Sequence, residues 1–307
     1  MNKHVVSIDF GGTNIKLGLV ALSGKIISRI SFPTKDFGSH KEKLIDAIVA
    51  HIFKLIETKK IAKNQILGIG MGLPGLIDPQ KGIVHFLPNV AGWRNVPLKK
   101  IMETKTQMPT FIDNDVNLMA LGEWQYGAGK GEKNLLCMTL GTGVGGGLII
   151  HNQLYRGESF AAGEIGHMPL NEYGPSCNCG GKACFERYVG NQVLQEKAAK
   201  IFKNKHMTLE DVFDLAKKDN IRAIQFWEEA AVHIGQALIG VVNLLNPRLI
   251  IIGGGVASSY FFMAKTIQQM IKKYCMKTQG AMVKVVKAKL GNDAALMGAL
   301  VLVKENV

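Results

Sequence analysis

Several features that would place this chain in a familiar class are missing from its 307 residues. No run of about 18 apolar residues occurs, so the sequence predicts no membrane-spanning helix. The opening residues MNKHVVSIDFGG do not resemble a signal peptide, because Asp9 interrupts the apolar run after four residues. No GxxxxGK[ST] motif is present, which excludes a P-loop nucleotide-binding protein. We therefore expect no membrane association, and the cysteines of the chain, which need to stay reduced, point to the cytoplasm.

The positive charge of the chain is large but dispersed. The formal net charge is +13, yet the lysines are scattered, as in KLIETKKIAK and KKYCMKTQ, with little aromatic interleaving. Nucleic-acid-binding surfaces usually cluster basic residues on one face or along one helix. We therefore expect a solvated surface and no nucleic-acid partner. The electrostatic field of the net positive charge would still help to recruit an anionic ligand.

Strands and helices alternate along the chain, which indicates an α/β fold. Apolar spacing predicts helices over 41–58, 97–107, 222–246 and 293–303, and strands over 5–10, 17–22, 26–32, 66–72, 110–113 and 248–256. A helix should also start near Asp115, with Asp115 as its cap. We expect an N-terminal lobe over 1–117 and a C-terminal lobe over 118–290. The last helix, about 291–307, should pack back on the first lobe through its small residues.

Each expected lobe opens with a strand, a glycine-rich turn and a second strand. Residues 10–13 (FGGT) align with 140–143 (LGTG), and residues 17–20 (LGLV) with 147–150 (GLII), at a constant offset of 130. This similarity predicts a duplicated fold with a cleft between its halves.

Only five cysteines are present, and three of them fall in the segment SCNCGGKACFE. His167 precedes Cys177, Cys179 and Cys184 in the same region. Three thiolates and one imidazole match a closed tetrahedral Zn²⁺ site, which would be structural because it leaves no open position. The other interpretation is a set of reduced thiols beside an unrelated histidine. Cys137 and Cys275 lie in apolar or helical contexts and should be core thiols.

Two glycine-rich turns are suited to binding phosphate through backbone N–H groups. The first turn contains Asp9, Gly11, Gly12 and Thr13; Asp9 could hold a Mg²⁺-bound water, and Lys16 either reaches phosphate or is exposed. The second contains Gly141, Thr142 and Gly143 and matches G-x-G-x-x-G. That turn opens a strand rather than a helix, so we reject the dinucleotide-binding interpretation.

Three carboxylates stand out as candidates for substrate chemistry. Asp115 ends the segment Asp113-Asn114-Asp115 at a strand–helix junction, where it could abstract a proton from an alcohol. Glu164 and Glu186 flank the Cys/His cluster, whose rigid loop would suit recognition of a polyhydroxylated ligand. Helix capping would explain one aspartate of Asp113-Asn114-Asp115 but not the whole segment.

The motifs together resemble the ROK family of sugar kinases, within the actin-like, hexokinase-like ATPase superfamily. The resemblance spans essentially the whole chain through DFGGTNIK, GLPGLID, LPNVAGW, DNDVN, LGTGVGGG, GEIGH, CNCGGKACFE and GGGV, in this order. Two departures are visible. Ala183 stands where the family usually has glycine, and Phe185 where an aliphatic residue is usual.

The resemblance implies a two-lobed, ribonuclease H-like fold and a set of site residues. Asp115 is implied to be the catalytic base, and the sugar site is expected to include Gly75, Asn89, Asn114, Asp115, Glu164, His167 and Glu186. Phosphates are expected at Gly11, Gly12, Thr13, Lys16, Gly141, Thr142 and Gly143, with Gly254 and Gly255 near the adenosine. A homodimer is usual for the family. Its transcription factors carry an N-terminal DNA-binding region, for which this chain has no room before its first strand.

The expected activity is ATP-dependent phosphorylation of the primary hydroxyl of a hexose, with Mg²⁺ accompanying ATP and glucose as the leading substrate. Alternatives within the same class are kinases for N-acetylmannosamine, N-acetylglucosamine, allose or fructose. A catalytically silent sugar sensor and a zinc-containing nucleic-acid binder are the non-enzyme alternatives. The sensor would not need Asp115 and both phosphate turns, and the binder would need the clustered basic and aromatic residues that are missing.

Overall fold

The computed structural model describes residues 3–37, 40–88, 90 and 92–307, and the chain divides into two compact units. Unit 1 consists of residues 1–131, 154–162 and 292–307, and unit 2 of residues 132–153 and 163–291. Unit 1 extends beyond residue 117, the expected boundary, because α3 (Asp115–Tyr126) packs against other elements of unit 1. The short excursion 154–162 was not expected from the sequence.

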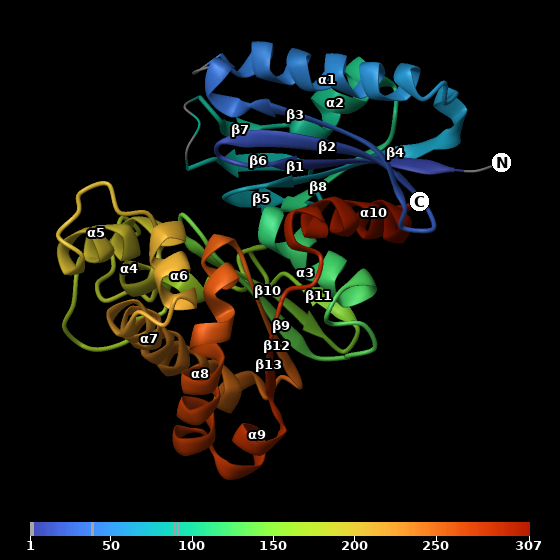
Figure 1. The fold of residues 1–307 in the computed structure, drawn as a ribbon. Coiled ribbons are helices and arrows are strands. Elements are labelled where there is room, and N and C mark those ends of the chain that lie inside the picture. Colours follow the sequence, from blue (N-terminus) through green and yellow to red (C-terminus); the bar gives the residue numbers. More distant parts are fainter. Residues whose placement is uncertain (1–2, 38–39, 89, 91) are drawn as a thin grey trace. The chain divides into compact units, whose positions relative to one another are not determined.

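A five-stranded mixed sheet forms the centre of unit 1 (Figure 1). Its order is β3-β2-β1-β4-β8, with β1 and β2 antiparallel and β1, β4 and β8 parallel. The strands are β1 (His4–Phe10), β2 (Asn14–Ala21), β3 (Ile26–Pro33), β4 (Ile66–Leu73) and β8 (Thr110–Asn114). A smaller antiparallel sheet contains β5 (Leu76–Asp78), β6 (Ile83–Phe86) and β7 (Arg94–Val96).

Helices cover both faces of the larger sheet. Figure 1 shows α1 (Lys41–Thr58) and α2 (Leu98–Thr106) on one side and α10 (Ala294–Asn306) on the other. The spacing that predicted α1 is confirmed, because one face of the helix buries Leu44, Ile45, Ile48, Ile52, Leu55 and Ile56. Short 3₁₀ turns lie at Thr34–Phe37 (η1), Lys63–Gln65 (η2) and Gly291–Asp293 (η5).

Small residues allow α10 to pack closely on α3 and β4, as its composition predicted. A Cβ at Gly298 would overlap the Leu118 carbonyl, and a Cβ at Gly122 would overlap the Ala294 carbonyl. A Cβ at Gly70 of β4 would lie 3.0 Å from the Ala299 methyl group. Larger side chains at these glycines would force α10 away from α3 and from β4.

Unit 2 repeats the sheet of unit 1. Its order is β11-β10-β9-β12-β13, with β9 and β10 antiparallel and β9, β12 and β13 parallel. The strands are β9 (Leu135–Leu140), β10 (Val144–Ile150), β11 (Gln153–Tyr155), β12 (Leu249–Gly253) and β13 (Lys284–Lys287). The last two residues of β11 already belong to the excursion 154–162, which is part of unit 1. The helices are α4 (Glu186–Val189), α5 (Asn191–Ile201), α6 (Leu209–Lys217), α7 (Ile221–Leu245), α8 (Tyr260–Tyr274) and α9 (Lys277–Met282), with η3 (Ile165–His167) and η4 (Gly255–Ser259).

The matching strand orders confirm the predicted duplication, with one correction to its alignment. Ser7 pairs with Gly18 in unit 1, and Cys137, which is 130 residues after Ser7, pairs with Gly147 in unit 2. The first strands are therefore offset by 130, but the second strands by 129. The turn of unit 2 is one residue shorter, which the sequence comparison did not reveal.

The two isolated cysteines are core residues, as expected. Cys137 is fully buried in β9, and Cys275 is buried after α8. Among the described residues, no helix combines the length and the apolar character that crossing a bilayer requires.

Candidate functional site

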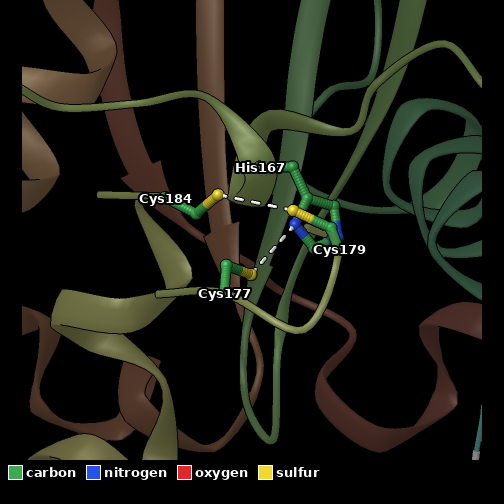
Figure 2. A group of neighbouring side chains, drawn as sticks. All are labelled: His167, Cys177, Cys179 and Cys184. Carbon is green, nitrogen blue, oxygen red and sulfur yellow. Dashed lines mark hydrogen bonds between the residues drawn. The ribbon is translucent and has the colours of Figure 1, made fainter. Parts of the chain in front are cut away.

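The Cys/His cluster assembles as its spacing predicted. One nitrogen of His167 and the sulfur atoms of Cys177, Cys179 and Cys184 all lie within 4.8 Å of one another (Figure 2). The Cys179 and Cys184 sulfurs are 3.6 Å apart, and the Cys177 sulfur is 3.7 Å from Nδ1 of His167. All four residues belong to unit 2.

These separations fit a metal site. Tetrahedral bonds to zinc would place neighbouring donor atoms about 3.6–3.8 Å apart. Burial raises the pKa of Cys177 to about 12 and also raises that of Cys184, whereas the N–H group of Gly181 lowers the pKa of Cys179. Two buried thiols would thus keep their protons unless a cation replaces them, which is the usual coupling of metal binding to proton release. The donor set is therefore suited to a thiophilic divalent ion.

A tight double turn brings the three sulfurs together. The Cys177 N–H donates to the Gly181 carbonyl, and the Gly180 N–H donates to the Cys177 carbonyl. Gly180 has a φ of 92°, which glycine adopts without strain. A Cβ at Gly181 would lie 3.4 Å from the Cys179 sulfur and 3.5 Å from the Cys184 sulfur. Glycine at position 180 therefore lets the loop curl around the sulfur atoms, whereas a side chain at position 181 would make only ordinary contacts with them.

The two departures from the family pattern have distinct structural consequences. Ala183 is fully buried and has a φ of 54°, a conformation in which glycine would be unstrained. Its Cβ occupies the space beside Gly174, where another Cβ would come within 2.8 Å. Phe185 is fully buried in the core of unit 2. Neither residue displaces a candidate ligand.

Carboxylates lie on both sides of the His167 ring. Nδ1, which faces Cys177, is also 3.7 Å from Oε1 of Glu186, and Nε2 is 3.9 Å from Oε2 of Glu164. The Cys177 thiol donates to Oε1 of Glu186 across 3.1 Å. A metal held by the cluster would therefore fix the ring and, through it, the neighbourhood of both glutamates.

The glycine-rich turn of unit 2 lies beside this group. A Cβ at Gly143 would come 3.2 Å from Oε2 of Glu186, so a larger residue there would disturb the turn and the glutamate together. The Gly141 N–H donates to the Gly143 carbonyl and is thereby used within the turn. The amide groups of Thr142 and Gly143 are then the better candidates for an anion.

Two further segments gather at the same edge of the sheet. Gly254 follows β12 with a φ of 83°, and a Cβ there would lie 2.7 Å from the backbone nitrogen of Leu140. Asn191, at the start of α5, donates its N–H to the Gly141 carbonyl, and a Cβ at Gly255 would lie 3.9 Å from its Nδ2. Sequence reasoning identified Gly254 and Gly255 but missed Asn191, which no motif marks.

In unit 1, the first glycine-rich turn is braced by a threonine from η1. The Gly11 N–H donates to the Asn14 carbonyl, and the Thr34 hydroxyl donates to the Gly11 carbonyl across 2.8 Å. Asp9 and Lys16 are cross-strand neighbours whose charged groups lie 3.3 Å apart. Burial raises the pKa of Asp9, and Lys16 opposes that change. Lys16 is thus paired with Asp9 in this structure.

Strand register brings Asp9 and the predicted base to one edge of the same sheet. Asp9 pairs with Gly72 of β4, and Gly72 pairs with Asp113 of β8. A Cβ at Gly72 would lie 3.2 Å from the Cα of Asp115. Parallel strands end together at such an edge, where open α/β sheets bind ligands.

The cap of α3 is Asn114, and the prediction that Asp115 caps it is wrong. The Asn114 carboxamide oxygen accepts from the N–H groups of Val116 and Asn117 at 2.9 and 3.3 Å. Asp115 is the first helical residue, a position that a carboxylate favours because of the helix dipole. The Asp115 carboxylate also accepts from the Val116 N–H across 3.0 Å, so it contributes to the same helix start.

Gly75 lies close to this junction, and its carbonyl accepts from Nδ2 of Asn114 across 3.2 Å. Its φ of 94° and the nearby Phe86 carbonyl both require glycine. Asn89, the remaining predicted sugar ligand, lies outside the described residues.

Sequence reasoning missed Arg156, a residue of the excursion 154–162. Its Nε and Nη2 each donate to Oδ2 of Asp113 across 2.7 Å. Asp113 is almost fully buried and belongs to the same unit. No local pattern joins two residues 43 positions apart, so only the fold reveals this pair.

Comparison with known proteins agrees with this geometry. The sequence profile described as ROK family matches residues 5–306. A glucokinase from Halalkalibacterium halodurans is 36% identical, with 99% of this chain and 96% of that protein covered. A xylose repressor from Bacillus spizizenii is 32% identical over 99% of this chain and 77% of the repressor. The crystal structure of a ROK family glucokinase from Streptomyces griseus in complex with glucose and AMPPNP is 29% identical, with a TM-score of 0.84 and 98% and 99% of the two chains covered. On this evidence, the chain belongs to the ROK family.

Proposed function

We propose that this protein is an ATP-dependent hexokinase that converts glucose to glucose 6-phosphate. The observation that carries the proposal is Asp115, placed at the first turn of α3 and at the same sheet edge as Asp9 and the first glycine-rich turn. The similarity of the chain to glucokinases over nearly its full length supports the same activity.

Asp115 is the proposed general base. Its carboxylate takes the proton of the sugar's primary hydroxyl as the sugar oxygen bonds to the γ-phosphorus of ATP. The bond between that phosphorus and the β–γ bridging oxygen breaks, and ADP leaves. Proton transfer of this kind contributes about 10²–10⁴-fold to the rate, and the rest of phosphoryl transfer depends on positioning and charge stabilisation.

The glycine-rich turns are the proposed phosphate-binding elements. The amide groups of Thr142 and Gly143 in unit 2, and of Gly12 and Thr13 in unit 1, would donate to phosphate oxygens. Asp9 would hold Mg²⁺ through a water molecule. Mg²⁺, when bound with ATP, supplies positive charge to the phosphates.

The proposed recognition groups for sugar hydroxyls are Glu164, His167 and Glu186 of unit 2. We propose the same role for Asn114 and Gly75 of unit 1. Zn²⁺ held by His167 and the three cysteines would be structural, because four protein ligands leave no site for substrate. Its contribution would be to keep the His167 ring and Glu186 in place.

A coupled assay of ADP release over a panel of sugars tests the proposal. The panel contains glucose, fructose, allose, N-acetylglucosamine, N-acetylmannosamine and xylose, each measured at several concentrations. Glucose should give the highest kcat/KM. A higher value with another hexose would reassign the substrate within the same chemistry.

The similarity to xylose repressors favours a sugar sensor as the second candidate. A sensor would bind a sugar, measured by calorimetry, without releasing ADP in the presence of any member of the panel. That result would exclude the kinase and retain sugar binding.

Two other expectations accompany the proposed enzyme. A cytoplasmic location is supported by the five cysteines, none of which is joined in a disulfide bond among the described residues. A homodimer is expected from the family resemblance, and light scattering coupled to gel filtration would measure it.

Replacing Thr142 by valine should weaken ATP binding selectively. The change removes one hydroxyl while keeping the size of the side chain, and a hydrogen bond to a charged group contributes about 1.5–3 kcal/mol. We therefore expect the KM for ATP to rise about 10-fold or more, with the KM for glucose unchanged. Thr278→Val, at an exposed position of α9 in the same unit, is the matched control and should change neither constant more than about 2-fold. Equal increases in both KM values for Thr142→Val would contradict the assignment.

A further inference from the structure

The carboxylate of Asp113 has all its hydrogen-bonding positions filled by residues of unit 1. Oδ2 accepts from Nε and Nη2 of Arg156, each across 2.7 Å. Oδ1 accepts from Nδ2 of Asn117 across 2.8 Å and from the backbone N–H of Asn114 across 2.7 Å. Asp113 is only 2% exposed, so its charge depends on these partners rather than on water.

The partners of Asp113 surround the start of α3. Asn114 caps the helix and Asn117 lies in its first turn, and both donate to the same carboxylate oxygen. Asp115, the proposed base, lies between them in the chain. The orientation of Asp113 therefore helps to set the backbone that carries Asp115.

Arg156 reaches Asp113 from a segment that is distant in sequence. The excursion 154–162 belongs to unit 1, although the residues on both sides of it belong to unit 2. The excursion is closed by the Ala162 N–H, which donates to the Arg156 carbonyl across 2.9 Å. Burial raises the pKa of Glu305 in α10 of the same unit, while the charge of Arg156 lowers this pKa and that of Asp113 raises it. Arg156 thus neutralises the charge of the buried Asp113 carboxylate.

From this arrangement, we propose that Arg156 is a positioning residue for Asp115, acting through the carboxylate of Asp113. The inference rests on the proposed role of Asp115 as the base. Arg156 contacts Asp113 and is not itself proposed to touch a reacting atom. Its rigid guanidinium directs two N–H donors at the same oxygen, Oδ2 of Asp113, a fixed geometry that a lysine ammonium does not provide.

The test compares kcat and KM for Arg156→Gln, Asp115→Asn and the double variant. A displacement of about 1 Å in a catalytic group costs about 100-fold in rate, so Arg156→Gln should lower kcat about 10–100-fold. The KM values for glucose and ATP should stay within about 3-fold, because neither substrate is bound by Arg156. In the Asp115→Asn background the same change should have almost no further effect on kcat, since the base it positions is already lost.

The matched control is Arg29→Gln, which removes the guanidinium paired with the exposed Asp293 in the same unit. Its kcat should equal that of the unchanged protein. If Arg156→Gln fails to fold by circular dichroism, Arg156→Lys retains the charge and Arg156→Ala can be supplied with guanidinium ion. Lower kcat in the lysine variant, or partial recovery of kcat in the alanine variant with guanidinium, supports the inference.

The outcomes separate this inference from the proposed function. Unchanged kcat in folded Arg156→Gln, or an equal loss of kcat in both backgrounds, overturns the positioning role and leaves Asp115 as the base. Unchanged kcat in Asp115→Asn alone overturns the base assignment, and the positioning role is lost with it.

Discussion

Replacing Asp115 by asparagine should lower kcat by about 10²–10⁴-fold, the usual contribution of a general base. The carboxamide keeps the shape of the side chain but cannot accept the hydroxyl proton. The helix start should survive, because Asn114 rather than Asp115 caps α3. We therefore expect KM for glucose and the melting temperature to change little, as measured by the coupled assay and by thermal unfolding.

Asp46→Asn serves as the control for this change. Asp46 is an exposed carboxylate paired with Lys105 on the surface of unit 1, 2.7 Å away. Its loss should leave kcat unaltered. If Asp115→Asn turns over within a few-fold of the unchanged protein, Asp115 is not the base, and another group must take the proton.

Replacing Cys179 by serine should remove stoichiometric zinc and raise the KM for glucose. A serine hydroxyl is a poor ligand where a thiolate is required, and even changes outside the ligand set cost about 10–100-fold in metal affinity. Without the ion, the His167 ring and Glu186 would lose their common anchor, because both lie within 3.7 Å of the Cys177 sulfur. We expect about one zinc per chain in the unchanged protein, as in closed structural sites, and at least a 10-fold increase in the glucose KM when it is lost.

Elemental analysis and separate titrations of glucose and ATP measure this effect. The KM for ATP should rise less than that for glucose, since the cysteines lie nearer to Glu186 than to Thr142 in the chain and in their contacts. Cys275→Ser, a buried thiol outside the cluster, is the control and should keep both the zinc and the KM values. An unchanged protein without metal, or a Cys179→Ser variant with normal glucose saturation, would show that the thiols are merely reduced cysteines.

Features that depend on local spacing were predictable from the sequence. The bounds of α1 follow from its apolar face, and the Cys/His cluster follows from four ligands within a short segment rich in glycine. The duplicated hairpins were also recognisable, because glycine and aliphatic residues recur at nearly constant distance. In each of these cases, the interacting residues are neighbours in the chain, or the same pattern occurs twice.

Features that depend on side-chain geometry or on long-range pairing were not predictable. The two candidate caps of α3, Asn114 and Asp115, are adjacent in the chain, and both residue types favour the cap position. The contact of Arg156 with Asp113 joins an excursion to a strand end, and no periodicity signals it. The proximity of Gly143 to Glu186 likewise arises only when the fold of unit 2 brings the glycine-rich turn and the start of α4 together.

The division of unit 1 among three chain segments affects how the protein folds during synthesis. All residues of unit 2 precede Asn292, whereas α10, which fills the groove against α3 and β4, lies after them. At about 5–20 residues per second on the ribosome, a nascent chain exposes early segments for seconds before late ones emerge. Unit 2 can therefore be complete while the surfaces of α3 and β4 that α10 will cover are still exposed. We expect a chaperone to bind the nascent chain at those surfaces.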